Sequence, residues 1–346
     1  MQRIRFTCLS AALVVVAMIV ALAAPAFGQA AKYTVPKTPW GDPDLQGQWP
    51  ASANIPMQRP ATLADRSTLT KEEYDRQVAQ ARQRDEADQQ EFAPSANGVT
   101  INPPGYWVER AKPHQQTSLV VDPPDGRVPA LTPAGRDVVQ SLRGGLGPGQ
   151  HFPEKVDSPE DFDFYSRCIT RGPVASMLPT LYNYGNHIVQ GPGYVAIRSE
   201  MIHETRVIPL DGRPHAGNTI RTFMGDARGH WEGDTLVVET TNLSDKTGTG
   251  GGYFSDQAKL IERFTRVGPK ELSYDLTIND PKTWTKTWTI HYPYTLDPEY
   301  PVYEYACHEG NYMMLEALKG ARLLESSGRS AKVDRGEAGG PPPGAR

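Results

Sequence analysis

The chain has 346 residues, of which 32 are glycine and 31 are proline, and its formal net charge at neutral pH is −4. This glycine and proline content excludes a coiled coil or a bundle of long helices, because both residues disfavour a helix interior. It has no three-residue period and occurs among many aromatic residues, which excludes collagen and a wholly disordered chain. The acidic net charge excludes a generally basic nucleic-acid-binding protein, so no nucleic-acid partner is expected.

Residues 1–28 have the layout of a secretory signal peptide. Arg3 and Arg5 precede an apolar run over residues 9–24, and small residues follow that run. The run is shorter than the roughly 20 residues that a membrane-spanning helix needs, although an uncleaved anchor is the alternative. We therefore expect cleavage and export, to a bacterial periplasm or beyond, with no stable membrane span afterwards.

Cleavage removes one of the three cysteines and leaves Cys168 and Cys307. Two cysteines in an oxidising compartment predict a disulfide bond between them. The alternatives are two buried free thiols or a catalytic thiol.

Residues 29–150 are expected to form a proline- and glycine-rich arm that contains one polar helix. Residues 31–60 hold six prolines, which forbid a helix or a central strand, yet Trp49 and its neighbours are too apolar for a free linker. We therefore expect this part to extend across the body of the protein. The pattern Thr70-Lys71-Glu72-Glu73 is a capping box, and it predicts an exposed helix that continues to about residue 90.

Short strand-forming runs with turn signals between them fill the chain from residue 186 onward. Leu272, Tyr274 and Leu276 alternate with polar residues, and this period of two is typical of antiparallel strands with unlike faces. The predicted strands are residues 187–190, 194–199, 204–210, 219–224, 235–241, 259–267, 271–279, 284–292 and 302–307.

This pattern predicts a mainly β fold, in which an antiparallel meander closes into a lipocalin-like barrel or forms a strongly curved sheet. A proline-rich N-terminal arm and a few short helices complete the fold. The barrel-like domain is predicted over residues 151–325, with a closing helix at 311–322. Residues 326–346 have nothing to bury and are expected to be a disordered tail.

Four strings of the mature chain resemble a family of exported bacterial proteins. They are PWGDPDLQGQW at 39–49, RVIPLDGRPH at 206–215, GDARGHWEGDTLVVETTN at 225–242 and YACHEGNY at 305–312. The resemblance spans about residues 36–323, and it implies secretion and a largely β body but no particular activity. The meander over 235–292 also looks like a lipocalin-type barrel, a likeness of architecture that does not fix function.

Ionisable residues are unusually dense between residues 200 and 234. Strand alternation places Asp226, Arg228 and His230 on one face, which we expect to point inward. An aspartate orients a neighbouring histidine and makes it a stronger base, and an arginine supplies a partner for negative charge. We therefore predict His230 as the catalytic acid or base, Asp226 as its orienter and Arg228 or Arg206 as the charge stabiliser, with His203 as a second acid–base candidate. The alternative is a structural ion-pair network around a hairpin.

Five further residues are candidates for binding a ligand. Arg206 or Arg213 could hold an anionic group, and rings with polar ends could line a pocket for a planar molecule, although most rings are expected in the core. The aromatic candidates are Tyr194, Trp231 and Trp288. Histidines 203, 215 and 230 raise the question of zinc, but the spacing of a zinc site is absent, so we predict no metal and no cofactor.

These predictions lead to three hypotheses of function. The first is an exported enzyme that acts on a small, partly apolar organic molecule by hydrolysis, elimination or isomerisation in a β-barrel cavity. The second is a periplasmic small-molecule carrier of the same fold. The third is an envelope-associated structural protein in which the charged cluster only joins strands. The sequence leaves the oligomeric state open.

Overall fold

The computed structural model describes residues 33–63, 65–89, 109–141, 156–180, 182–249 and 252–327. Contacts divide the chain into two compact units, Met1–Thr34 and Val35–Arg346, and the description that follows concerns the second. The predicted signal peptide and all but the first two residues of the predicted tail lie outside the described residues. Within the described ranges, no helix is both long and apolar enough to span a membrane.

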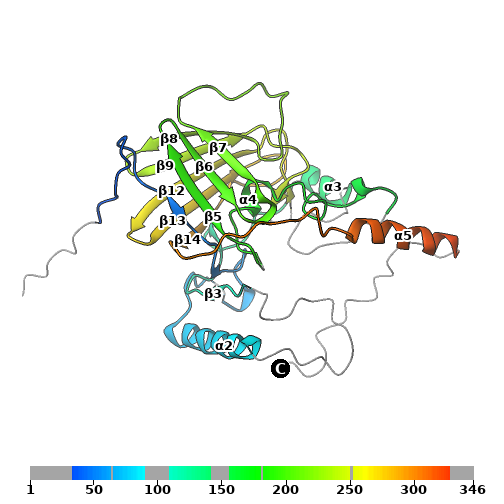
Figure 1. Ribbon diagram of the computed structural model, residues 1–346, viewed down its shortest axis with the longest axis horizontal. Helices are drawn as coiled ribbons and strands as arrows, with labels where there is room; N and C mark the ends of the chain where they lie inside the picture. The colour runs from blue at the N-terminus through cyan, green and yellow to red at the C-terminus, as the bar shows by residue number, and fades with distance from the viewer. Residues whose placement is uncertain are drawn as a thin grey trace, which may run out of the picture. The chain divides into compact units, whose positions relative to one another are not determined.

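The fold is mainly β, and two antiparallel sheets face each other across the core (Figure 1). The four-stranded sheet has the order β1 (Gly47–Gln48), β5 (Asn186–Gly191), β6 (Tyr194–Ser199) and β7 (Thr205–Pro209). The six-stranded sheet has the order β4 (Val120–Asp122), β14 (Trp288–Thr295), β13 (Glu271–Asn279), β12 (Lys259–Gly268), β9 (Thr235–Thr241) and β8 (Asp226–Glu232). Most predicted strands therefore form, with bounds shifted by a few residues.

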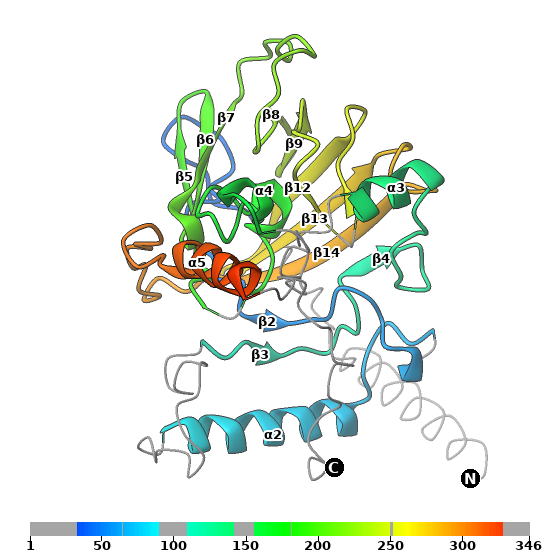
Figure 2. The same cartoon turned by 90° about the vertical axis from the view of Figure 1, so that its right-hand side faces the viewer.

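The remaining described elements are two small ladders and a set of helices. Two small ladders pair β2 (Ala53–Asn54) with β3 (Lys112–Pro113) and β10 (Gly248–Thr249) with β11 (Gly252–Tyr253). The helices are η1 (Ala61–Leu63), α2 (Lys71–Gln89), α3 (Pro133–Ser141), η3 (Pro159–Asp161), α4 (Gly172–Ala175), η4 (Met201–His203) and α5 (Met313–Ser326). Figure 2 shows α2 beside the β2–β3 ladder, apart from the two large sheets.

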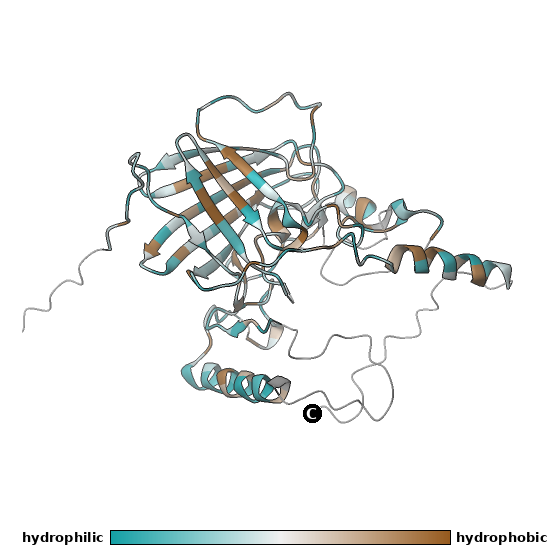
Figure 3. Cartoon of the chain, in the orientation of Figure 1, coloured by the Kyte–Doolittle hydropathy of each residue, from teal (hydrophilic) through white to brown (hydrophobic). Residues whose placement is uncertain are grey.

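Alternation along the strands builds the core. Leu272, Tyr274 and Leu276 of β13 are fully buried, while the residues between them are only half-buried. Figure 3 shows the same alternation of apolar and polar residues along the strands of the sheets. The prediction that the N-terminal arm packs on the body is confirmed, because Leu45 and Trp49 are fully buried in this core.

The predicted barrel closure is not seen. Strands β7 and β8 lie close to each other, but no backbone ladder joins the two large sheets in the described part of the chain. Two predicted strands are also absent. Residues 219–224 make a single isolated bridge, at Thr222. Residues 302–307 form no ladder because the Tyr303 N–H donates to the side chain of Glu200 instead of to a neighbouring strand.

The capping box at the start of α2 is confirmed. The backbone N–H of Glu73 donates to Thr70 Oγ1 at 3.2 Å, and the Thr70 N–H donates to the Glu73 carboxylate at 2.9 Å. These two bonds satisfy donors that the first turn of a helix leaves free. The helix is polar and largely exposed, as its thin apolar face predicts.

Candidate functional site

Asp226, Arg228 and His230 share one face of β8, as predicted, but that face points away from the core. Ala227 and Gly229 occupy the buried positions between them. A Cβ atom on Gly229 would lie 2.6 Å from Leu210 and 2.9 Å from Ile208, so neighbouring side chains already fill the interior. The expectation that the three charged side chains point inward is therefore wrong.

The outer face of β8 carries an ion-pair network. Asp226 accepts hydrogen bonds from the His215 Nδ1–H at 3.1 Å and from the Ala216 backbone N–H at 2.7 Å, and it pairs with Arg228. The exposed His230 ring instead contacts Glu232, at 3.2 Å. Asp226 thus orients His215 rather than His230, and the proposed triad is not assembled as a unit.

Arg206 lies in the core and is paired. Its guanidinium donates two hydrogen bonds to Glu262, at 2.5 and 2.8 Å, and Glu262 also accepts the Tyr274 hydroxyl at 3.0 Å. Burial alone would lower the pKa of Arg206, but the charge of Glu262 raises it above the ordinary value. This pairing gives Arg206 a structural role rather than a free charge for a ligand.

The other ligand-binding candidates lie apart from one another. Arg213 is exposed and pairs with its neighbour Asp211. Tyr194 is exposed on β6, and Trp231 is half-buried against the core. Trp288 is fully buried and packs edge-on against Trp284, with ring centroids 5.6 Å apart. The structure does not bring these side chains into one site.

Strained backbone marks a different region. A residue other than glycine rarely adopts a positive φ, and a β-branched one does so least readily. Five such residues occur in the described ranges, and four of them are Cys168 (57°), Asn183 (52°), Ile202 (63°) and His203 (48°). The Cys168–Cys307 disulfide and the hydrogen bonds of Asn183 and His203 bring these four residues close together. Strained backbone is often found at functional sites, so the region around these four residues is a candidate site.

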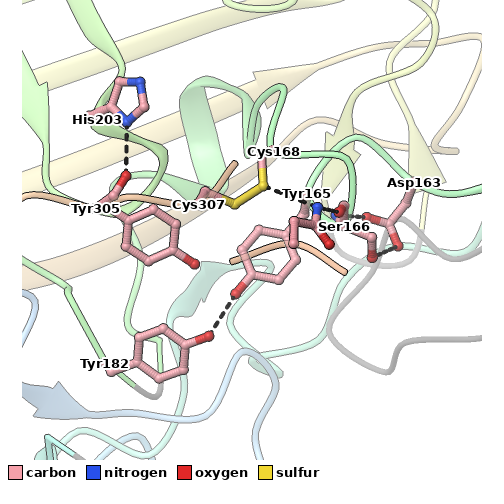
Figure 4. The surroundings of a disulfide bond; sticks show 9 residues. Asp163, Tyr165, Ser166, Cys168, Tyr182, His203, Tyr305 and Cys307 are labelled. Atoms are coloured by element: carbon pink, nitrogen blue, oxygen red, sulfur yellow. Dashed lines mark hydrogen bonds between the residues drawn. A yellow bond between two sulfur atoms is a disulfide. The ribbon is translucent and has the colours of Figure 1, made fainter. Parts of the chain in front are cut away.

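The predicted disulfide between Cys168 and Cys307 is confirmed and lies at the centre of this region (Figure 4). The Asn311 amide donates to the Ser166 carbonyl at 2.7 Å and contacts Cys168 Sγ at 3.3 Å. The disulfide and these bonds hold the segment around residue 307 against the segment around residue 168.

Three tyrosine hydroxyls meet beside the disulfide. The hydroxyls of Tyr165 and Tyr182 are 3.3 Å apart, and the Tyr305 hydroxyl turns toward Tyr165. The rings of Tyr182 and Tyr305 stack within 14° of parallel. Burial raises the pKa of Tyr165, and it raises the pKa of Tyr305 to about 12. All three side chains are half-buried.

Arg171 completes this group, which we call the tyrosine site (Tyr165, Arg171, Tyr182 and Tyr305). Its guanidinium carbon lies 5.9 Å from the Tyr165 ring centroid. The nearby Glu204 carboxylate accepts the Arg171 backbone N–H at 3.3 Å and the Thr170 hydroxyl at 2.6 Å. Burial raises the pKa of Glu204 and lowers that of Arg171.

Two carboxylates share one phenol next to the tyrosine site. The Tyr300 hydroxyl lies 2.9 Å from Glu109 Oε2 and 2.9 Å from Glu200 Oε2. The buried Glu200 also accepts the Asn183 amide at 2.8 Å and the Tyr303 N–H at 3.0 Å. We call Glu109 and Glu200 the carboxylate pair. Tyr184 stacks on Tyr300 and covers the pair from one side.

The carboxylate pair and the tyrosine site are neighbours along two segments. Asn183, which bonds to Glu200, lies between Tyr182 and Tyr184. Tyr303, which bonds to Glu200, lies two residues before Tyr305. Two residues span at most about 7 Å, so the two groups adjoin each other.

His203 is the one predicted catalytic residue in this region. Its Nδ1 lies 3.2 Å from the Tyr305 carbonyl oxygen. A carbonyl only accepts, so the His203 Nδ1 carries the hydrogen of this bond. Figure 4 shows the ring bonded to the Tyr305 backbone, while the Tyr305 hydroxyl turns toward Tyr165. His203 therefore supports the segment that carries Tyr305.

A groove of about 700 Å³ lies along α2, and its lining contains none of the residues of the tyrosine site or the carboxylate pair. Its lining includes Gln77, Gln80, Arg84 and His114, and burial lowers the pKa of His114. The described lining contains no carboxylate and no cysteine, so it offers no acid or nucleophile to work with the histidine. We do not regard it as the active site.

Sequence reasoning identified only His203 and the disulfide in this region. The residues come from segments near 109, 165–171, 182–184, 200–204 and 300–307. The one local signal was the density of tyrosines around 182 and 305. Within the described ranges, no group of three or more histidine, cysteine, aspartate or glutamate side chains could hold a metal. Comparison of the chain with family models, curated proteins and solved structures gives no match.

Proposed function

We propose that the chain is an exported enzyme that acts on a small, partly apolar organic molecule by acid–base chemistry, with Glu109 as the acid. The reaction class is hydrolysis, elimination or isomerisation, each of which needs a proton placed on or removed from the substrate. The reaction takes place at the carboxylate pair rather than in a barrel cavity or at His230.

The observation that carries this proposal is the Tyr300 hydroxyl, 2.9 Å from both carboxylates. A phenol has one hydrogen to donate, so it can satisfy only one of the two. Glu200 also accepts the Asn183 amide and the Tyr303 N–H, and Glu109 accepts the backbone N–H groups of Asn183 and Tyr184. One carboxyl group of the pair can hold a proton and donate it to the Tyr300 oxygen while the Tyr300 hydroxyl donates to the other, and we assign that proton to Glu109.

The electrostatics of the region favour the proton on Glu109. Burial raises the pKa of Glu109, and the negative charge of Glu200 raises it further, whereas the hydrogen bonds that the ionised form accepts from the Tyr300 hydroxyl and from the backbone of Tyr184 and Asn183 oppose the rise. Asp297 adds negative charge near Tyr184, on the same side. A carboxyl group that holds its proton closer to neutral pH is suited to act as a general acid. Glu109 is half-buried, so a substrate and water can reach it.

The test is turnover with and without this acid. A periplasmic metabolite extract is incubated with the purified chain and followed by untargeted mass spectrometry. We expect at least one compound to be converted, and we expect Glu109→Gln to slow its conversion by about 100-fold or more. Glu304→Gln, an exposed glutamate on the segment of Tyr303 and Tyr305, is the matched control and should retain the wild-type rate.

A second measurement does not need the substrate. Infrared difference spectra of the wild type should contain a protonated-carboxyl band that is absent from Glu109→Gln and present in Glu304→Gln. Conversion at the wild-type rate by Glu109→Gln would refute the role of this acid. A compound that co-purifies and is recovered unchanged, with no conversion of any other, would instead identify a binding protein.

A further inference from the structure

Arg171 is a cation with no carboxylate partner among the residues that the structure describes. No carboxylate in the described part of the chain lies within ion-pair distance of its guanidinium. Glu204, which approaches the Arg171 backbone, bonds to the N–H and to the Thr170 hydroxyl instead. The groups that face the guanidinium are the three tyrosines of the tyrosine site. A partly desolvated positive charge without a partner is unfavourable, and an anion would relieve it.

The three tyrosine hydroxyls around Arg171 each have a hydrogen to donate, and few acceptor groups lie near them. Tyr165, Tyr182 and Tyr305 bring three hydroxyl hydrogens together, and the bond between Tyr165 and Tyr182 is long, at 3.3 Å. Hydroxyls rotate to suit the partner they find. An oxyanion placed among them would accept from the phenols and from the guanidinium at once, and such charge-assisted bonds are stronger than those between neutral hydroxyls.

We infer that the tyrosine site binds the carboxylate of an organic acid, with Arg171 as the ionic partner and the tyrosine hydroxyls as additional donors. The planar guanidinium matches the two oxygens of a carboxylate. The inference rests on the proposed function, because it names the group that holds the substrate beside Glu109.

The test uses benzoate as the probe and benzamide as its neutral isostere, with binding followed by isothermal titration and by saturation-transfer NMR. We expect benzoate to bind the wild type, and benzamide to bind at least about tenfold more weakly. Arg171→Gln should weaken benzoate binding by about 10- to 100-fold, the range for a hydrogen bond to a charged group. Arg198→Gln, an exposed arginine on β6, is the matched control and should not change it.

Tyr182→Phe is a second variant that controls for misfolding, because it removes one hydroxyl and keeps the Arg171 charge and the aromatic ring. It should weaken benzoate binding by about 2- to 10-fold while the thermal midpoint stays close to that of the wild type. Benzoate that does not bind the wild type, or that binds Arg171→Gln equally well, would overturn the inference. So would inorganic phosphate that binds through Arg171 where benzoate does not.

The two proposals fail separately. Glu109→Gln lies outside the tyrosine site and should bind benzoate as the wild type does. If benzoate binds through Arg171 but no compound is converted, the site recognises a carboxylate and the proposed enzyme activity is wrong. If conversion depends on Glu109 but benzoate does not bind, the acid–base function stands and the carboxylate inference is wrong.

Discussion

The buried ion pair between Arg206 and Glu262 gives the most quantitative prediction. The two side chains are 5% and 1% exposed, and Glu262 also accepts the Tyr274 hydroxyl. Glu262→Gln removes the charge but keeps an oxygen for that hydroxyl. It leaves Arg206 as an uncompensated buried cation, which costs about 3–5 kcal/mol of folding free energy in comparable pairs.

A second variant separates charge from packing. Arg206→Met combined with Glu262→Leu and Tyr274→Phe replaces the whole polar group by apolar side chains of similar volume. Such replacements are often neutral or stabilising, so the triple variant should recover most of the loss caused by Glu262→Gln alone. The double variant that keeps Tyr274 beside Glu262→Leu would strand the tyrosine hydroxyl in the core, at a cost of about 1–3 kcal/mol.

The assay is urea unfolding followed by tryptophan fluorescence, with the slope of the transition compared between variants. Glu316→Gln is the control, because the Lys319–Glu316 pair on α5 is exposed and its loss should not be measurable. The reasoning would be refuted if Glu262→Gln were as stable as the wild type, or if the triple variant were as unstable as that single variant. Either result would reopen a ligand-binding role for Arg206.

Three other predictions concern the candidate site. Because the pKa of Glu109 is raised, the folded state binds its proton more tightly than the unfolded state does. This stabilisation is complete at acidic pH and is lost as the pH rises through the folded pKa. The urea midpoint of the wild type should therefore fall relative to that of Glu109→Gln above about pH 4. Tyr305, with its pKa raised to about 12, should ionise late in an ultraviolet titration, and Tyr305→Phe should remove one late-titrating phenol. Reduction of the disulfide, which joins residues 139 positions apart, should lower stability by up to about 5 kcal/mol in urea unfolding, and Cys168→Ala with Cys307→Ala should do the same without reductant. The Glu109 prediction is wrong if the two urea midpoints stay equal above about pH 4. The Tyr305 prediction is wrong if Tyr305→Phe leaves the titration unchanged, and the disulfide prediction is wrong if reduction leaves the urea curve unchanged.

Local patterns predicted the features that depend on neighbouring residues. The capping box at Thr70, the alternation along β13 and the pairing of two cysteines each need only short stretches or a simple count. The orientation of β8 was not predictable in this way. Its charged residues alternate with Ala227 and Gly229, and the interior side holds small residues because Ile208 and Leu210 already occupy that space.

The candidate site could not be predicted because it is assembled from distant segments. Glu109, Glu200 and Tyr300 have no spacing that relates them in the sequence, and only the fold brings them to hydrogen-bonding distance. The same holds for Arg206, whose partner Glu262 lies on another sheet. A basic residue in the sequence reveals its charge, but only the structure reveals whether that charge is already paired.

Every residue of the tyrosine site and of the carboxylate pair lies in a connection, and none lies in a β-strand. The core is formed instead by the strands and by the arm that packs on them. Substitutions in the connections can therefore alter which molecule is recognised without opening cavities among the core side chains. If the proposed function holds, selection or a directed-evolution experiment could exchange one substrate for another while the two sheets retain their stability. Libraries that vary residues 165–171, 182–184 and 300–306 would reach this variation most directly.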